Sequence, residues 1–555
     1  MGSQAITTAG RPAPAQPPAP GRPPASARPP APGRPPAPGR PGASRGWPML
    51  AVLLLGQFMC IIDVFVVNVA MPSIGASLHA SGASLQLVVG GFTIAYAVLL
   101  ITGARLGDRY GRRRVYLTGV ITFTAASLAC ALAPDSQLLI AFRFAQGAGA
   151  AALVAQVFSL IQLRFTGQAR ARALSAYAAV LSAGAVAGLV LGGVVVTADL
   201  FGLGWRPVFG INVPVGILLA LAVPRVVPAD EPTADEPTAV EPTAGRRPVG
   251  EPTVGKLPVG KLPVGKLPAG KLPAARSGAS RLDLAGLAVA GPAVLLVVLP
   301  LVIGHEAGWP SWSLCCIAAG ALLGAAFVLV ERRVAARGGN PLLNLDVLQA
   351  PGLPTGLVAL ASTQLCYGCL LFALTLHLQA GLGYSPLRAG LAYLPMAVTF
   401  GLVGYCWRRL PGGVRRVMVP CGLAVSALAY LGIAAEPRGG YLELTLAAAG
   451  LGLGLSVGPL LTQTLAHVPR ARAADASGLL TTTVQLGQVM GVAVLGSVYL
   501  SRAAAAPASG HALASARTLA SAAAISGTAG WLAVLSVIGL PAAIAMTRAA
   551  RRAEV

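Results

Sequence analysis

The stretch Gly103 to Leu117, GARLGDRYGRRRVYL, decides the fold because it sets a dense group of charges between two long apolar runs. It holds five of the protein's 41 Lys/Arg residues, together with Asp108. The runs on either side carry hardly a charge. Charges at this density belong in water or among lipid headgroups, so the chain should cross a membrane just before and just after them. The pattern predicts a helical hairpin with a basic, glycine-hinged turn on the cytoplasmic side.

The composition of the whole chain points to an all-α integral membrane protein. Its 555 residues are 55% hydrophobic and 11% charged, with a mean hydropathy of +0.71. Soluble domains carry about 25% charged residues. The net charge of +23 comes from short basic clusters between apolar runs, and only 5% of residues are aromatic. This distribution suits anionic headgroups and membrane topology and argues against a nucleic-acid partner.

The apolar runs that are long enough to span a bilayer number about 14. With the N-terminus in the cytoplasm, all but six of the 41 Lys/Arg residues fall on the cytoplasmic side. The positive-inside rule therefore predicts an even number of spans with both termini inside, in a plasma membrane. The runs cover residues 48–70, 85–104, 115–133, 138–160, 174–196, 207–226, 282–303, 312–331, 354–377, 388–406, 416–434, 442–464, 477–500 and 526–547.

Two segments cannot bury a core. Residues 1–47 are rich in proline, alanine, glycine and arginine, which predicts a disordered cytoplasmic tail. Residues 231–275 form pentads that begin EPTAD and end KLPAA. A proline every five residues forbids a regular helix and predicts a flexible linker between six spans and eight. The pentads have two interpretations: a linker without a specific partner, or a charged docking segment.

Reactive chemistry is not indicated. The cysteines lie within or at the ends of apolar runs, and the CxxC pair at Cys366 and Cys369 has no second Cys or His pair at metal spacing. Small apolar residues one helical turn apart explain that pair better than a metal does. No nucleophile–base pair or phosphate loop is evident. We expect no enzyme activity, no metal and no cofactor other than protons as coupling ions.

Asp63 is the acidic residue that lies deep inside an apolar run, and Arg143 is its basic counterpart. At 1.5 Å per residue, each side chain lies about 8 Å from the outer face of a ~30 Å hydrocarbon core. The two could therefore pair, with protonation of Asp63 releasing Arg143. Ionisable residues inside a membrane are by default functional, although a purely structural ion pair would fit the same pattern. We expect Asp63 and Arg143 to couple proton movement.

Small residues repeat at helical spacing in the fifth run, at Gly184, Gly188, Gly192 and Gly193. This spacing lets helices pack with their backbones close together, and it serves plain packing as readily as a specific function. Glutamines within spans could contact a substrate or form interhelical hydrogen bonds equally well. The candidate cavity residues are Gln57, Gln86, Gln463 and Gln485.

Taken together, these motifs resemble a 14-span drug–proton antiporter of the major facilitator superfamily. The charged turn is similar to the superfamily's loop between spans two and three, at Asp108, Arg109, Gly111, Arg113 and Arg114. The glycines of the fifth run resemble the antiporter motif, with Leu189 where that motif carries proline. Further matches lie in the first, fourth, sixth, tenth and thirteenth spans, at Asn68 and Pro72, Gln146 and Gly147, Trp205 to Gly216, Ser385 to Pro395, and Ala476 to Gly487.

The resemblance implies the major facilitator fold, with two six-helix bundles that rock around a site near the midplane. Its expected parts are a cytoplasmic tail (1–47), an N-terminal bundle (48–226), a low-complexity linker (227–281), two inserted helices (282–350), a C-terminal bundle (351–547) and a cytoplasmic tail (548–555). In the family, the charged turn braces the cytoplasmic gate, with its aspartate meeting a helix N-terminus of the other half.

The implied function is proton-coupled export of hydrophobic or amphipathic small molecules such as drugs and antibiotics, by a monomer. One alternative is an exporter dedicated to a single endogenous metabolite. Another is a transport-inactive membrane sensor or scaffold that uses the pentads and the arginine-rich tail to dock partners.

Overall fold

The computed structural model describes residues 43–229, 284–337, 345–469, 472–504 and 513–554. The expected disordered tail lies outside these ranges up to residue 42, as does the expected linker from residue 230 onward. Residues 1–44 and 45–555 form separate units, and the second of them holds the helices that could cross a membrane.

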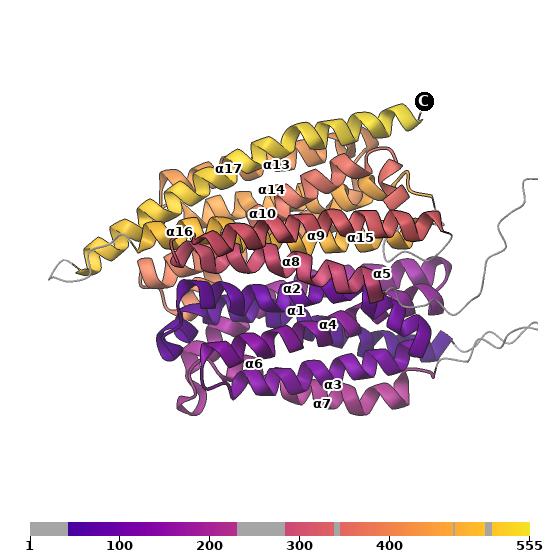
Figure 1. Cartoon of the computed structure of the whole chain (residues 1–555), viewed down its shortest axis with the longest axis horizontal. Coiled ribbons are helices and arrows are strands. Elements are labelled where there is room, and N and C mark those ends of the chain that lie inside the picture. Colours follow the sequence, from indigo (N-terminus) through magenta and orange to yellow (C-terminus); the bar gives the residue numbers. More distant parts are fainter. Residues whose placement is uncertain (1–42, 230–283, 338–344, 470–471, 505–512, 555) are drawn as a thin grey trace, which may run out of the picture. The chain divides into compact units, whose positions relative to one another are not determined.

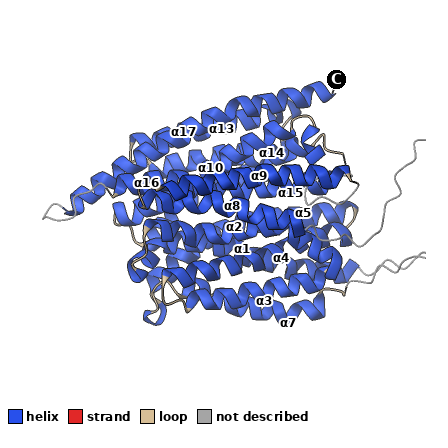
Figure 2. Cartoon of the chain, in the orientation of Figure 1, coloured by secondary structure: helices blue, strands red, loops and turns tan. Residues whose placement is uncertain are grey.

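The described residues form helices joined by short loops and contain no strand, as Figure 2 shows. This confirms the all-α fold predicted from composition. Before the linker, the helices follow the expected spans closely, except that the sixth span begins with a separate short turn. Their bounds are α1 (Ala43–Leu78), α2 (Gly82–Tyr110), α3 (Arg112–Ala131), α4 (Ser136–Arg164), α5 (Gly167–Ala198), η1 (Leu200–Gly202), α6 (Pro207–Gly210) and α7 (Asn212–Val226).

After the linker, two expected spans are each divided into shorter helices. The tenth expected span is split at Tyr393, and the thirteenth contains a π-helical turn. The bounds are α8 (Leu284–Glu306), α9 (Ser311–Ala336), η2 (Leu345–Gln349), α10 (Leu353–Leu376), η3 (His377–Gly381), α11 (Pro386–Ala392), α12 (Leu394–Cys406), η4 (Trp407–Arg409), α13 (Gly412–Ala435), α14 (Leu442–Leu465), α15 (Ala473–Met490), η6 (Gly491–Leu495), α16 (Gly496–Ala503) and α17 (Leu513–Glu554).

In the described part of the chain, 13 helices are long and apolar enough to cross a membrane, and a shorter apolar helix spans Ala288–Gly304. Together they agree with the expected count of about 14. Near the span ends, Trp205 and Trp407 are buried within the protein, whereas Trp47, Trp309 and Trp312 are exposed. The residues expected to form a C-terminal tail continue the last helix, because α17 runs on to Glu554.

Local sequence explains where these helices begin and end. Gly111 separates α2 from α3 with a φ of +92°, a conformation that side chains with a Cβ rarely adopt. Ser81 and Asp135 cap α2 and α4, each accepting a backbone N–H three residues on. The basic hairpin predicted from GARLGDRYGRRRVYL is therefore a turn of one glycine between two long helices.

The helices pack in an N-terminal group, α1–α7, and a C-terminal group, α10–α17. In the first, α4 packs between α2 and α3; in the second, α13 packs against α14 and α17, and α10 against α15 and α17. Figure 1 shows the long helices of both groups lying side by side; of the inserted pair, α9 packs on α8. Helix α8 contacts both α2 and η6, so it touches both groups.

Several contacts between the two groups lie at the helix ends nearest Trp205, which we call the Trp205 end, and α2 also packs against α15. The opposite end, at Gly111, is the charged-turn end. The side-chain amide of Gln379 donates to the carbonyl of Val69 at 2.8 Å, and that of Gln86 to Ser497 Oγ at 3.1 Å. The helices α5 and α11 also touch there. The two groups are thus joined by polar contacts at the Trp205 end.

Candidate functional site

The central feature of the N-terminal group is a buried ion pair between α1 and α4. Arg143 donates from Nη1 to Oδ2 of Asp63 at 2.5 Å. Asp63 is 0% exposed and Arg143 is 1% exposed. The similar depths expected from helix rise thus place the two charges in direct contact. The two buried charges balance each other, as buried ions require.

The second carboxylate oxygen of Asp63 is held by neutral amides. Gln146 Nε2 donates to Oδ1 at 2.7 Å, and Asn212 Nδ2 donates to the same atom at 2.8 Å. The Gln146 amide also donates to Ser127 Oγ at 2.7 Å. These partners come from α4, α7 and α3, so four helices of the N-terminal group meet at this carboxylate. All of these side chains are buried.

Arg143 has partners of its own besides Asp63. Its Nε donates to the carbonyl of Val88 at 2.9 Å, and its Nη1 also lies 2.7 Å from Oε1 of Gln146. The guanidinium lies 4.6 Å from the ring centre of Phe92 and 5.7 Å from that of Phe209. Contacts with ring faces stabilise a cation where water is excluded. The guanidinium would therefore remain partly supported if Asp63 became neutral.

The glycines of α5 lie against α1, the helix that carries Asp63. A Cβ on Gly188 would lie 2.9 Å from the carbonyl oxygen of Ile62, and one on Gly184 would lie 2.8 Å from Ile61. Gly192 approaches the next turn of α1 in the same way. Gly193 instead faces the C-terminal group, where a Cβ would lie 2.7 Å from Cα of Leu387. The motif thus packs α5 onto α1 and also meets the other half.

The charged turn has its own ion pair. Asp108 accepts from Arg112 at 2.5 Å, across the turn between α2 and α3, with the Asp108 side chain half exposed. Arg109 stacks on the neighbouring tyrosine ring. The remaining arginines of the set, Arg113 and Arg114, lie in the first turn of α3. Asp108 therefore pairs with its own hairpin in this structure, whereas the family pattern pairs it with the other half.

The four glutamines are not brought together. Gln57 is buried in α1, and its side-chain oxygen finds no donor among the described residues. Gln86 bonds to a serine of α16 near the Trp205 end. The side-chain amide of Gln463 donates to the carbonyl of Arg415 in the first turn of α13, at the charged-turn end. Gln485 lies part-way along α15, partly buried.

Sequence reasoning missed three members of the site. Gln146 and Asn212 were noted only as motif residues, and Ser127 was not noted at all. A charge inside an apolar run is a strong signal in the sequence, whereas a neutral polar side chain at the depth of Asp63 is not.

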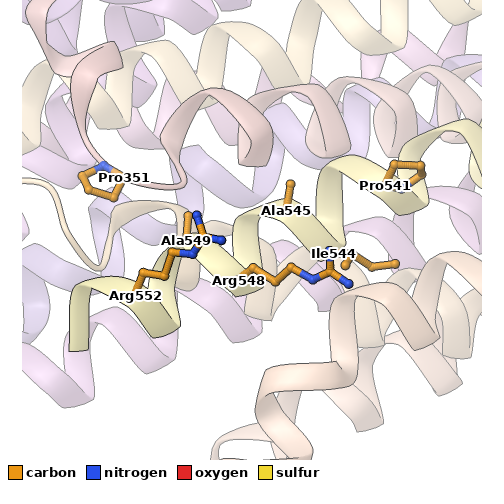
Figure 3. A pocket seen from close by; sticks show the side chains of 7 residues that line it. All are labelled: Pro351, Pro541, Ile544, Ala545, Arg548, Ala549 and Arg552. Carbon is orange, nitrogen blue, oxygen red and sulfur yellow. The ribbon is translucent and has the colours of Figure 1, made fainter. Parts of the chain in front are cut away.

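An open groove of about 630 Å³ lies apart from these residues, beside the end of α17. Figure 3 shows its lining, in which Arg548 and Arg552 project from α17 beside apolar side chains and Pro351. None of its lining residues takes part in the Asp63 network. Among the described residues, no group of three or more His, Cys, Asp or Glu side chains could hold a metal ion.

Comparison with known proteins identifies the architecture. The family model described as "Major Facilitator Superfamily" matches residues 53–350, which include the Asp63–Arg143 site and the charged turn. The chain belongs to the major facilitator superfamily. The family predicted from the sequence motifs is thereby confirmed, and this superfamily consists of transporters rather than enzymes.

Several relatives are named for the transport or export of an antibiotic or for multidrug resistance. The "Probable actinorhodin transporter" of Streptomyces coelicolor is 36% identical, over 82% of this chain and 73% of its own length. The "Cephamycin export protein CmcT" of Amycolatopsis lactamdurans is 34% identical, over 84% of this chain and 87% of its own. The "Multidrug resistance protein Stp" of Mycobacterium tuberculosis is 31% identical, over 80% and 74%.

Solved structures agree on the major facilitator fold. A bacterial homolog of the human lysosomal transporter Spinster, crystallised in an inward-facing and unoccupied conformation, aligns with a TM-score of 0.62 at 19% identity. The alignment covers 92% of this chain and 98% of that one. A peptide transporter of the POT family aligns with a TM-score of 0.56 at 17% identity, over 91% and 97%.

Proposed function

We propose that this protein exports hydrophobic or amphipathic small molecules, such as antibiotics and other drugs, across the plasma membrane in exchange for protons. The observation that carries the proposal is the buried Asp63–Arg143 pair, a titratable carboxylate held between helices of one half. Relatives more than 30% identical to this chain over the aligned residues are named for the transport or export of an antibiotic or for multidrug resistance. Together these favour a proton-driven exporter.

Asp63 is the residue that would exchange the proton. As a carboxylate it holds Arg143 and two amides; as a carboxylic acid it no longer balances the charge of the guanidinium. A buried cation without its counter-ion is costly, so protonation favours a rearrangement of α1 against α4. Arg143 would keep Val88 and the aromatic rings as partners during that step. This gives proton binding a direct effect on helix packing.

Alternating access is supported by where the two halves touch. Polar contacts join α1 to η3 and α2 to α16 at the Trp205 end. We assign the charged-turn end to the cytoplasm, because basic residues between spans favour that side. The structure would then represent a state closed toward the outside. Return to the outward-facing state would break these contacts and close the charged-turn end.

The available energy is sufficient for such a cycle. One charge that moves through 100 mV supplies about 2.3 kcal/mol, before any pH gradient is added. That corresponds to a substrate gradient of roughly fifty-fold. A single exchanged proton can therefore maintain useful export.

The test is efflux from proteoliposomes that contain the purified protein, under an imposed pH gradient. Actinorhodin, a cephamycin and puromycin are suitable probes, because relatives are named for their transport or for resistance to them. We expect proton-driven efflux by the wild type and none by Asp63→Asn. Full proton-driven efflux by Asp63→Asn would remove the role assigned to that residue.

A narrower function is favoured by the names of some relatives, which specify one compound, actinorhodin or cephamycin. Others are named for multidrug resistance. A resistance profile in a hypersensitive host separates the two. Protection against a single compound would indicate a dedicated exporter, and protection against unrelated compounds would indicate a multidrug exporter.

A further inference from the structure

The two halves of the chain repeat the same close helix crossings at a constant spacing. In the first half, α3 crosses α4 where a Cβ on Gly119 would lie 2.8 Å from the carbonyl oxygen of Gly149. In the second, α13 crosses α14 where a Cβ on Gly422 would lie 2.6 Å from that of Gly452. The offset is 303 residues at both positions (422 less 119, and 452 less 149). The crossing is therefore duplicated.

The contact that supports the Asp63 helix is repeated with the same offset. Gly188 of α5 lies against the carbonyl of Ile62 in α1, and Gly491 of η6 lies against the carbonyl of Leu365 in α10. Both members of the second pair are again 303 residues later (491 less 188, and 365 less 62). The residue after Leu365 is thus the counterpart of Asp63, and it is Cys366.

The same offset gives counterparts for the partners of Asp63. The segment RFAQGAG at 143–149 corresponds to LAAAGLG at 446–452, with its glycines in register. Leu446 therefore stands where the first half has Arg143, and alanine stands where it has Gln146. Both replacements are 0% exposed. Each of the two charged residues of the ion pair therefore corresponds to a neutral, buried residue in the second half.

The surroundings of Cys366 are those of a neutral group. Its sulfur lies 3.5 Å from the carbonyl oxygen of Leu532 and 3.7 Å from Oγ of Ser536, both on α17. Nearby titratable groups are the thiol of Cys369 and the phenols of Tyr367 and Tyr430. None of these can supply the permanent positive charge that Arg143 gives to Asp63.

The first site has a different set of neighbours. Asp63 faces Arg143 from α4 and the thiols of Cys60 in its own helix and Cys130 in α3. Among the described side chains of α1–α7 and α10–α17, Asp63 is the buried carboxylate. The imidazole of His377 is also buried. It lies at the Trp205 end, hydrogen-bonded to Ser521 and to the carbonyl of Pro437.

We propose that the second half carries an uncharged copy of the coupling site, centred on Cys366, and that the protein exchanges one proton per transported molecule, at Asp63 alone. This rests on the proposed function. The two halves share their helix packing. The first half carries the ion pair that exchanges the proton, and the second half carries neutral side chains at the equivalent positions. The buried core of the second half includes Cys366, Leu446 and Ala449, and the thiol of Cys366 takes no part in proton exchange.

The first experiment tests the equivalence of the two sites without any transport assay. Cys366→Asp places a carboxylate opposite Leu446 in an apolar core, and should lower the Tm of the purified full chain by several degrees. Adding Leu446→Arg should restore a large part of the loss, as a counter-ion would. A control pair, Cys366→Asp with Leu453→Arg on the same helix, should give no recovery. Equal recovery of the Tm with Leu446→Arg and with Leu453→Arg, or recovery with neither, would overturn the equivalence of the two sites.

The second experiment measures the proton number in proteoliposomes with puromycin, at zero membrane potential. For one proton, a gradient of one pH unit balances about a ten-fold puromycin gradient, since both correspond to the same free energy. A balance near one hundred-fold would mean two protons and would overturn the proposal. Cys366→Ser should leave the balance point unchanged. Absence of puromycin transport would count against the proposed function, while the rescue experiment would still decide the site equivalence.

Discussion

Asn212 donates a hydrogen bond of 2.8 Å to Oδ1 of Asp63, although 149 residues separate them in the chain. The bond links the first turn of α7 to the middle of α1, and both side chains are buried. A hydrogen bond to a charged group contributes more to stability than one between neutral groups. Asn212 therefore ties α7 to the carboxylate of the proposed coupling site.

We predict that Asn212→Ala lowers both the stability of the protein and its proton-driven efflux. A hydrogen bond to a charged group contributes about 1.5–3 kcal/mol, so its loss should lower the free energy of unfolding by about that amount. The measurements are thermal unfolding in detergent and initial efflux in proteoliposomes under an imposed pH gradient.

The matched control is Asn68→Ala, which removes the same side chain from the same neighbourhood. Asn68 donates to the carbonyl of Val64 within its own helix and does not touch Asp63. Asn68→Ala should cost less stability and leave efflux closer to that of the wild type. Equal losses in both variants would show that the effect comes from altered packing rather than from the bond to Asp63.

A second prediction concerns the ion pair itself. Arg143→Met leaves Asp63 buried without a counter-charge, which costs roughly 3–5 kcal/mol of folding free energy. Asp63→Asn in the Arg143→Met background removes the orphaned charge, so the double variant should be more stable than Arg143→Met alone. Thermal unfolding in detergent measures this cycle. We expect neither variant to show proton-driven efflux, and a double variant no more stable than the single would contradict a direct pairing.

The sequence predicted much of this architecture because charges inside a membrane are rare. Asp63 and Arg143 were found from their place in apolar runs, and Gly111 from its place in the charged turn. Their helices follow from apolar length alone, within a few residues at each end. Bilayer dimensions and backbone hydrogen bonding allow few other arrangements for such a sequence.

Neutral polar residues were harder to interpret. Gln146, Asn212 and Ser127 are common residue types, and their meeting depends on how α3, α4 and α7 cross. No periodicity within a single helix encodes those crossings. The four glutamines show the same limit from the other direction, since residues of one type within apolar runs do not meet in the folded chain.

The third prediction tests the contact between α5 and α1. Gly188→Ala would place a Cβ 2.7 Å from Cβ of Phe65, so the two helices must move apart. We expect a loss of about 1–3 kcal/mol, the usual cost of overpacking, together with reduced transport. Thermal unfolding and efflux measure the two effects. Gly404→Ala is the control, because a Cβ there meets nothing within 4 Å; a similar loss from Gly404→Ala would argue against a specific contact.

The fourth prediction concerns Asp108 in the charged turn. Its pair with Arg112 is exposed, and such pairs contribute little to stability. Asp108→Asn should therefore leave the Tm nearly unchanged. If the turn acts as a gate, efflux should still fall several-fold. Asp346→Asn is the control, since its exposed pair with Arg472 spans 4.0 Å; equal effects of both substitutions on efflux would rule out a special role for Asp108.

The last prediction concerns how the inserted helices attach to the rest. Glu306, at the end of α8, accepts from the backbone N–H of Ala83 at 2.6 Å, in the first turn of α2. A carboxylate at a helix N-terminus meets unpaired N–H groups and the positive end of the helix dipole. Glu306→Gln keeps the size of the side chain but removes its charge, which should cost about 0.3–1 kcal/mol.

The consequence for transport depends on where α2 lies. Its first turns also contact α16 of the other half, through Gln86 and Ser497. Loosening α8 from α2 should therefore make the Trp205 end easier to open, which would appear as faster labelling of a cysteine placed at Leu387, at the contact between α11 and α5, in a Cys-free background. Glu443→Gln is the matched control, an exposed glutamate in the first turn of its own helix α14. Equal labelling rates in Glu306→Gln and Glu443→Gln would mean that α8 does not restrain this end.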